Sequence, residues 1–151
     1  TKRYADMLSA KTGMKAYSVN DLTGLNPDEE VIFLGWIKAG KIQGLNKACK
    51  FKLRAVCASG TARTAEPSEE ALMKRNKIEG IPFFYLRGGC LPVKELAFAD
   101  RVLMSMFLKF LKSRKDMDEK TKESIEHIQN GFDGVREENL EPVLAWLSKN
   151  N

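Results

Sequence analysis

The fold of this chain is decided by residues 31–45, Val-Ile-Phe-Leu-Gly-Trp-Ile-Lys-Ala-Gly-Lys-Ile-Gln-Gly-Leu. The uninterrupted apolar run at its start predicts a strand over Val31–Trp36 that is buried on both faces. Strands of this kind belong to parallel sheets covered by helices, and such sheets bind ligands at the carboxyl ends of their strands. The loop Trp36–Gly44 is therefore the first candidate for a binding surface.

The length of 151 residues predicts a single domain, residues 1–151, that buries a substantial core. Hydrophobic residues make up 43% of the chain and charged residues 30%, which is typical of a soluble globular protein. The three cysteines, Cys49, Cys57 and Cys90, show no Cys-x-x-Cys spacing and indicate reduced thiols. With no leader and no apolar run of about 20 residues, the expected location is cytoplasmic. Peripheral attachment at the inner face of the membrane is the alternative.

The chain is basic, with a formal net charge of +5 and a sequence pI near 9.1. Such a balance is compatible with nucleic acid, an anionic membrane or an acidic partner. The lysines are scattered among acids, which is typical of a mixed solvated surface. Because no basic stripe with interleaved aromatic residues is present, nucleic acid is not expected as a partner.

Helix and strand signals alternate along the first ninety residues. Strands are predicted over Lys15–Val19, Val31–Trp36, Leu53–Ala58 and Ile81–Leu86. Helices are predicted over Thr1–Thr12 with Gly13 as the stop, Leu45–Cys49, residues 68–77 with Ser68 as N-cap, and Leu96–Lys112. A charged helix capped by Asp116 and ending at Asn130, and a last helix from Asn139, complete the set. This alternation is typical of a doubly wound α/β sheet.

Three segments, taken in this order, resemble flavodoxin-like domains: Val31–Lys41, Cys57–Thr61 and Pro82–Gly89. The branch that the chain resembles most contains the menaquinone-dependent protoporphyrinogen dehydrogenases, whose long apolar helix and C-terminal segment match as well. The resemblance implies a three-layer α/β sandwich with a parallel sheet of order 2-1-3-4-5. It also implies flavin mononucleotide (FMN) as the cofactor, bound at the carboxyl edge of the sheet.

The start of the chain departs from the family pattern. Thr1-Lys2-Arg3-Tyr4-Ala5 resembles the last Thr of the family's phosphate loop and the helix that follows it. The family's first strand is then missing from residues 1–151, and it would lie between residues 15–19 and 31–36. Its absence would leave backbone N–H and C=O groups unpaired. A segment preceding Thr1 is the favoured source of that strand, and a protein without it or a strand from another chain are the alternatives.

The resemblance also implies which residues contact FMN. Thr1 would present helix N–H groups to the phosphate. One face of the flavin ring would be covered by Trp36, Ile37, Lys38, Ala39, Gly40 and Lys41. The pyrimidine edge would be approached by Ser59, Gly60 and Thr61, and the crevice bordered by Arg87, Gly88 and Gly89. Relatives often carry an aromatic residue near the position of Ala39, so ring stacking would fall to Trp36. Gly35 and Gly40 have a purely conformational explanation as well.

Other chemistry is weakly supported by the sequence. His127 stands alone on a charged helix, so no metal site is expected. Cys57 lies inside a predicted strand and is interpreted as a buried thiol. A phosphorylated receiver domain is disfavoured, because no acidic residue closes the strand Val31–Trp36. No catalytic residue is predicted.

The segment Leu96–Lys112 is apolar on almost every side. It either packs on the sheet with one extra apolar face, or docks a quinone, a membrane or a second subunit as a homodimer contact. Candidate contacts are Met104, Met106, Phe107 and Phe110, flanked by Lys109, Lys112, Arg114 and Lys115.

The predicted function is that of an FMN-dependent oxidoreductase domain. It would transfer electrons between a reduced substrate and a quinone or redox partner, while the flavin supplies the chemistry. A cofactor-free flavodoxin-like scaffold that acts as an interaction module is the alternative. The electron donor, the electron acceptor and the oligomeric state are left open.

Overall fold

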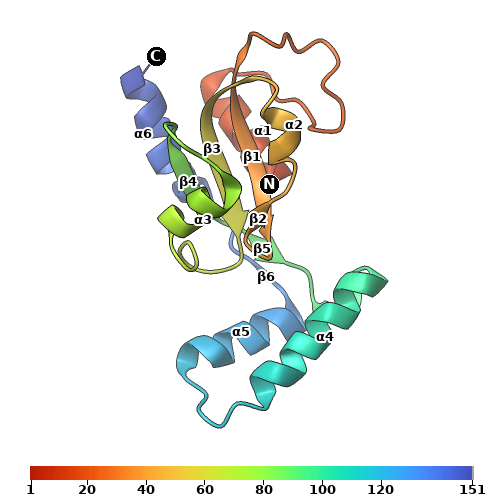
Figure 1. Ribbon diagram of the computed structural model, residues 1–151. Coiled ribbons are helices and arrows are strands. Elements are labelled where there is room, and N and C mark those ends of the chain that lie inside the picture. Colours follow the sequence, from red (N-terminus) through yellow and green to blue (C-terminus); the bar gives the residue numbers. More distant parts are fainter. Residues whose placement is uncertain (151) are drawn as a thin grey trace. The chain divides into compact units, whose positions relative to one another are not determined.

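The computed structural model describes residues 1–150 (Figure 1). The chain is an α/β protein with a four-stranded, mostly parallel sheet flanked by helices. Its internal contacts group the residues into two compact units. The sheet unit comprises Thr1–Gly88 together with the chain from Val135 onward, and the helical unit comprises Gly89–Gly134.

The sheet has the order β2-β1-β3-β4. Strands β1 (Glu30–Lys38), β3 (Lys52–Gly60) and β4 (Phe83–Arg87) are parallel neighbours, and β2 (Lys41–Ile42) pairs antiparallel with the end of β1. The parallel strand predicted from residues 31–36 is therefore confirmed. The family order 2-1-3-4-5 stays a prediction.

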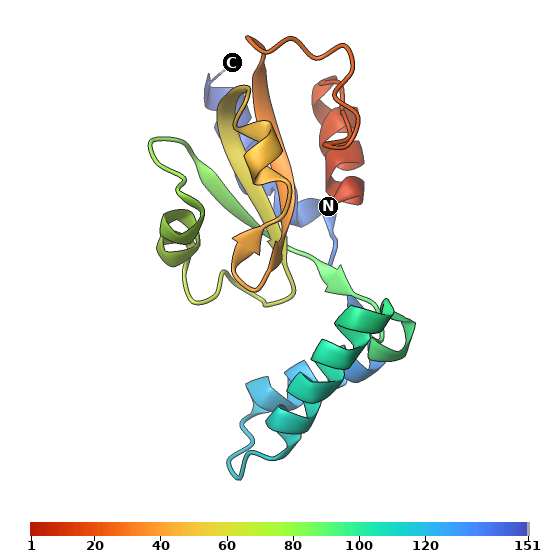
Figure 2. The same ribbon diagram turned by 45° about the vertical axis from the view of Figure 1, so that its right-hand side comes forward.

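Helices cover the sheet on both faces (Figure 2). On one face, Phe33, Val56 and Phe83 join α2 (Leu45–Ala48) and α3 (Glu69–Asn76) in one apolar cluster. On the other face, Cys57 and Leu86 pack with α1 (Lys2–Thr12) and α6 (Glu141–Asn150). Successive strand residues point to opposite faces, which is how neighbouring residues such as Val56 and Cys57 enter different clusters.

Gly13 and Ser68 mark the end of α1 and the start of α3, as the sequence predicts. Gly13, with φ 74°, ends α1 and donates its N–H to the Ser9 carbonyl. Ser68 caps α3 by accepting the Ala71 N–H at 3.1 Å. A short 3-10 turn, η2 (Glu137–Leu140), leads into α6.

Three sequence predictions within the sheet unit are wrong. Residues 15–19 form no strand; within residues 1–150 this region has a single isolated bridge, between Ser18 and Asp21. The segment after Trp36 is not an open loop, because β1 continues to Lys38 and folds back as β2. The strand buried on both faces is β3, in which residues 55–59 are all buried, whereas β1 is only half-buried.

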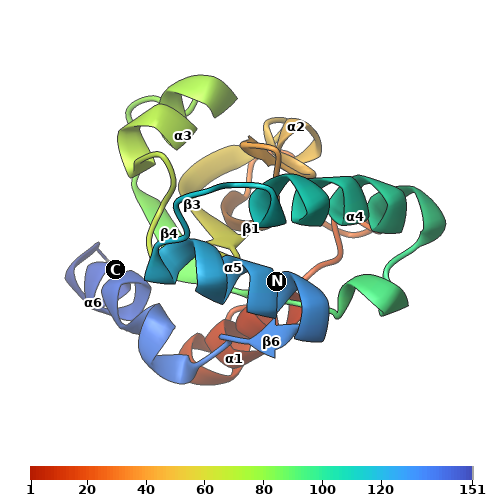
Figure 3. The same cartoon turned by 90° about the horizontal axis from the view of Figure 1, so that it is seen from below.

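The helical unit has its own small core. Strands β5 (Gly89–Cys90) and β6 (Phe132–Asp133) pair antiparallel at its base, next to the 3-10 turn η1 (Val93–Glu95). Helices α4 (Phe98–Lys112) and α5 (Glu119–Asn130) pack together around Leu111, Ile125 and Ile128 (Figure 3). The N-cap of α5 is Asp118, not the predicted Asp116. Within residues 1–150, no helix combines the length and the apolar character that a bilayer span requires.

Candidate functional site

The carboxyl ends of the three parallel strands meet at one edge of the sheet unit. Trp36 of β1 lies opposite Ser59 of β3, and Gly60 lies opposite Arg87 of β4. Gly88 follows directly and donates its N–H to the Gly60 carbonyl at 2.6 Å. A Cβ atom on Gly88 would lie 3.2 Å from that carbonyl oxygen, so a side chain fits poorly here. The register thus brings together residues that the sequence predicts as one site.

The first turn of α1 reaches the same edge. The Thr1 Oγ1 atom lies 3.1 Å from the Ser59 Oγ atom. Ser59 is buried and donates its hydroxyl to the Gly35 carbonyl at 3.3 Å, so Thr1 is the donor to the Ser59 oxygen. The Thr1 side chain makes no capping bond to α1, and the N–H groups of the first helical turn point toward this edge.

Trp36 presents an aromatic surface beside these hydroxyls. It is 48% exposed although it lies within β1, and the Lys38 Nζ atom sits 5.9 Å from its ring centroid. A flat, half-exposed indole near the carboxyl end of β1 is suited to stacking on a planar ligand. Trp36 is thus the one aromatic residue of the predicted covering segment, residues 36–41.

The rest of that covering segment serves the β1–β2 hairpin. Ala39 (φ 50°) and Gly40 (φ 76°) form its turn. Asn76 of α3 donates to the Gly40 carbonyl at 2.9 Å, and Lys41 donates its Nζ–H to the Arg75 carbonyl at 2.6 Å. These contacts dock the hairpin on α3 and engage the polar groups that the resemblance assigns to the flavin. Ile37 packs against the α2–α3 cluster.

Two further predicted residues lie beside Tyr85. A Cβ atom on Gly60 would come within 2.6 Å of the Tyr85 hydroxyl oxygen, so glycine is needed at this position. That hydroxyl donates to the Ala62 carbonyl at 2.8 Å, next to the exposed Thr61. Burial, reinforced by the nearby Glu66 carboxylate, raises the pKa of Tyr85 to about 12. Tyr85 therefore stays neutral and fixes the loop after β3.

Arg87 and Gly89, which the sequence predicts as part of the site, make other contacts in the structure. The Arg87 carbonyl accepts hydrogen bonds from Tyr4 and from the Asn139 Nδ2 atom, which lies 3.4 Å away. Tyr4 is fully buried and ties α1 to the end of β4, a role that its place on the apolar face of an amphipathic helix does not reveal. Gly89 belongs to the helical unit, where it pairs with Asp133.

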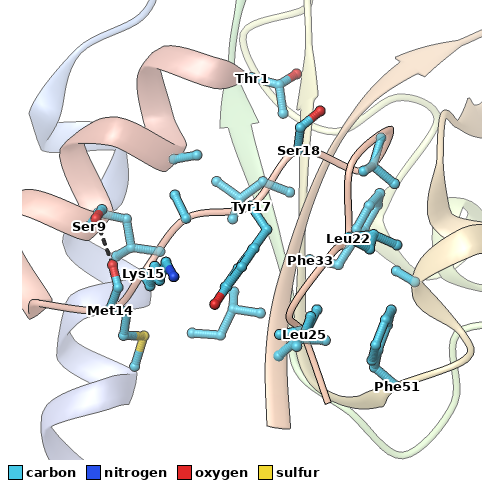
Figure 4. Close-up of a pocket in the computed structure, with 18 of the residues that line it drawn as sticks. Thr1, Ser9, Met14, Lys15, Tyr17, Ser18, Leu22, Leu25, Phe33 and Phe51 are labelled. Atoms are coloured by element: carbon cyan, nitrogen blue, oxygen red, sulfur yellow. Dashed lines mark hydrogen bonds between the residues drawn. The ribbon is translucent and has the colours of Figure 1, made fainter. Parts of the chain in front are cut away.

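A cavity of about 780 Å³ lies beside β1, and the strand and helix patterns alone do not reveal it. It lies between α1, residues 14–19 and the edge of β1 (Figure 4). Most of its lining is apolar, including Leu8, Met14, Tyr17, Phe33 and Phe51. The resemblance did point to this place, because the missing strand was expected between residues 15–19 and 31–36.

The helical unit exposes the outer face of α4. Phe98 is 74% exposed and Met106 is 65% exposed. The face consists of Phe98, Val102, Leu103, Met106, Phe107 and Phe110. Met104, which the sequence analysis placed on a docking surface, instead packs on the buried core of the helical unit. Lys109 and Lys112 lie in the last turn of α4, and Arg114 and Lys115 follow it.

The three cysteines are free thiols that differ in their burial. Cys57 is buried in β3, and burial raises the pKa of its thiol to about 12. Cys49 is exposed and Cys90 is half-buried. His127 stacks on Phe132 with ring centroids 4.0 Å apart. Among residues 1–150, no group of three or more His, Cys, Asp or Glu side chains is arranged to hold a metal ion.

Comparison with known proteins gave no match: no family model, curated protein or solved structure matches the chain.

Proposed function

We propose that the sheet unit binds FMN at its carboxyl edge and acts as the flavodoxin-like domain of an oxidoreductase. The observation that carries this proposal is that Thr1, Trp36, Ser59 and Gly88 lie together at one edge. Parallel α/β sheets bind their ligands at this edge. In this proposal β1, β3 and β4 take the places of the family's strands 3, 4 and 5.

Each of these residues has a defined part in binding. The N–H groups of the first turn of α1, with the Thr1 hydroxyl, would receive the phosphate. Trp36 would stack on one face of the ring system, and the main chain at Gly88 would approach its polar edge because no side chain intervenes. Bound FMN would supply the electron-transfer chemistry, while the chain supplies position and electrostatics.

Of the residues predicted to contact FMN, the proposal keeps Thr1, Trp36, Ser59 and Gly88. Gly40 and Lys41 are engaged with α3 and do not contribute free polar groups. Ser59 contributes through a hydroxyl that already bridges Thr1 and β1. In this proposal Trp36 is the residue of the segment 36–41 that would cover the flavin ring, and the chain would leave electron transfer to a redox partner to the rest of the edge.

Titration with FMN and with riboflavin tests this assignment. Quenching of flavin fluorescence should give a dissociation constant for FMN, and riboflavin should bind at least about 10-fold more weakly because it lacks the phosphate. Trp36→Ala should weaken FMN binding by a similar factor, whereas Ser148→Ala, an exposed substitution on α6, should leave it unchanged. A protein that shows no quenching, and whose thermal midpoint stays constant in excess FMN, refutes the proposal and leaves the cofactor-free scaffold.

The outer face of α4 fits an anionic membrane as the site where electrons reach a quinone. Six large apolar side chains are exposed together, and four basic residues lie at one end of the helix. Apolar insertion combined with attraction to anionic lipid is the pattern of an interfacial helix. Sedimentation with phosphatidylglycerol vesicles should capture the protein, and phosphatidylcholine vesicles should not. Phe107→Asp should abolish capture; dimerisation without capture would refute membrane docking.

A further inference from the structure

The short segment that ends β3 and follows it, residues 60–62, is held at both of its ends by the neighbouring strand. At one end, the Gly60 carbonyl accepts the N–H of Gly88, the residue that follows β4, at 2.6 Å. At the other end, the Ala62 carbonyl accepts the hydroxyl of Tyr85, within β4, at 2.8 Å. Because both ends are held, few backbone conformations are open to the residue between them.

Glycine at position 60 allows the Tyr85 side chain to reach this segment. Ala58 lies opposite Tyr85 in the sheet register, so the side chain must extend past Gly60 to contact Ala62. A Cβ atom on Gly60 would lie 2.6 Å from the Tyr85 hydroxyl oxygen and 2.8 Å from its Cε2 atom. A side chain at position 60 would therefore push the ring away, so the hydrogen bond depends on this glycine.

The Tyr85 hydroxyl keeps its proton and acts as a constant donor. Burial, reinforced by the Glu66 carboxylate, raises the pKa of Tyr85 to about 12. Within residues 1–150, no other hydrogen-bond donor reaches the Ala62 carbonyl. Removing this hydroxyl therefore releases one end of the segment.

The held segment carries two N–H groups that are available to a ligand. In the described part of the chain, residues 1–150, neither Thr61 nor Ala62 donates its N–H to another group of the protein. The Gly60 carbonyl and the Thr61 N–H belong to one trans peptide and point in opposite directions. Since this carbonyl faces Gly88, the Thr61 N–H is directed away from β4, toward the side of β3 on which β1 lies.

We propose that Tyr85 is a positioning residue of the carboxyl-edge site, whose hydroxyl orients the Thr61 and Ala62 N–H groups toward the polar edge of bound FMN. This inference rests on the proposed function. The polar edge of the flavin accepts hydrogen bonds, and reduction adds negative charge to it. Hydrogen bonds to a charged group are stronger than those to a neutral one, so the two donors should stabilise reduced FMN more than oxidised FMN.

NMR relaxation of the protein without flavin tests whether the hydroxyl holds the segment. In Tyr85→Phe the order parameters of the Thr61 and Ala62 amides should fall from about 0.85 to below about 0.6. The matched control is Tyr17→Phe, which removes the hydroxyl of a tyrosine that lines the cavity and should leave both values unchanged. Unchanged order parameters in Tyr85→Phe overturn the inference, whether or not the protein binds FMN.

Flavin binding separates a positioning role from a merely structural one. By anaerobic calorimetry, the dissociation constant of Tyr85→Phe should rise about threefold for oxidised FMN and about tenfold for dithionite-reduced FMN. The ratio of FMN to riboflavin affinities should stay at its wild-type value, because the phosphate position on α1 is unchanged. Equal losses for the two redox states, or a changed ratio, overturn the inference.

Gly60→Ala tests the same contact from the other side. Its methyl group displaces the Tyr85 hydroxyl, so this variant should weaken FMN binding as Tyr85→Phe does, and the double variant should bind no more weakly than Gly60→Ala alone. Independent losses that multiply in the double variant overturn the inference. A wild-type protein that binds no FMN refutes the proposed function and the ligand of this inference; failure of the Tyr85 contact is distinguished from it because that failure shows in the order parameters without flavin.

Discussion

Removal of the Tyr4 hydroxyl should destabilise the sheet unit measurably. Tyr4 is fully buried; it donates to the Arg87 carbonyl and accepts from the Asn139 Nδ2 atom at 2.5 Å. In Tyr4→Phe the Arg87 carbonyl loses the Tyr4 donor, and the Asn139 amide loses its hydroxyl acceptor. Losing two hydrogen bonds made by a fully buried side chain costs about 2–3 kcal/mol of unfolding free energy.

Urea denaturation at 25 °C measures this loss, and a thermal scan should show a midpoint lower by about 4–12 °C for a protein of this size. The matched control is Tyr17→Phe, because the Tyr17 hydroxyl makes no hydrogen bond within residues 1–150 and lies in the cavity. That control should change the unfolding free energy by less than about 0.5 kcal/mol. If Tyr4→Phe also changes the unfolding free energy by less than about 0.5 kcal/mol, the role given to this hydroxyl is refuted.

Three other predictions address the hairpin, the helical unit and the thiols. Gly35→Ala places a methyl group 2.6 Å from the Ile42 Cγ2 atom and 3.0 Å from the Gln43 carbonyl oxygen. Urea denaturation should therefore show a loss of about 1–3 kcal/mol in unfolding free energy. Wild-type stability would argue against the close packing of β1 on β2. Hydrogen bonds from Thr121 hold the pKa of the Asp118 carboxyl below its ordinary value of 3.8. The ionised carboxylate therefore stabilises α5 above pH 3.8, and this stabilisation is lost as the pH falls through the lowered pKa. Thermal scans should therefore show a gap between wild type and Asp118→Ala at pH 6 that closes on acidification, and a gap that is constant with pH would contradict this. Alkylation at pH 8, followed by mass spectrometry, should modify Cys49 first, Cys90 more slowly and Cys57 only on unfolding. The reason is that burial raises the pKa of the Cys90 and Cys57 thiols. Early labelling of Cys57 would show that it lies outside the core.

The parallel core was predictable because its information is local. The apolar runs of β1, β3 and β4 suit a covered sheet, and Ser68 and Gly13 carry strong helix-end signals. The hairpin after Trp36 was missed because its turn is Ala39-Gly40. Two-residue turns with positive φ at both positions favour Asn-Gly or Asp-Gly, so Ala39 gives no such signal.

The remaining failures come from long-range contacts. Residues 15–19 have the composition of a strand but no partner with which to pair, so propensity alone could not produce one. The apolar character of α4 indicated a covered helix, whereas its outer face is exposed and only Met104, Leu108 and Leu111 pack inward. For the candidate site, sequence order correctly grouped Trp36 with Ser59. It could not show that Lys41 is drawn to α3 by a hydrogen bond.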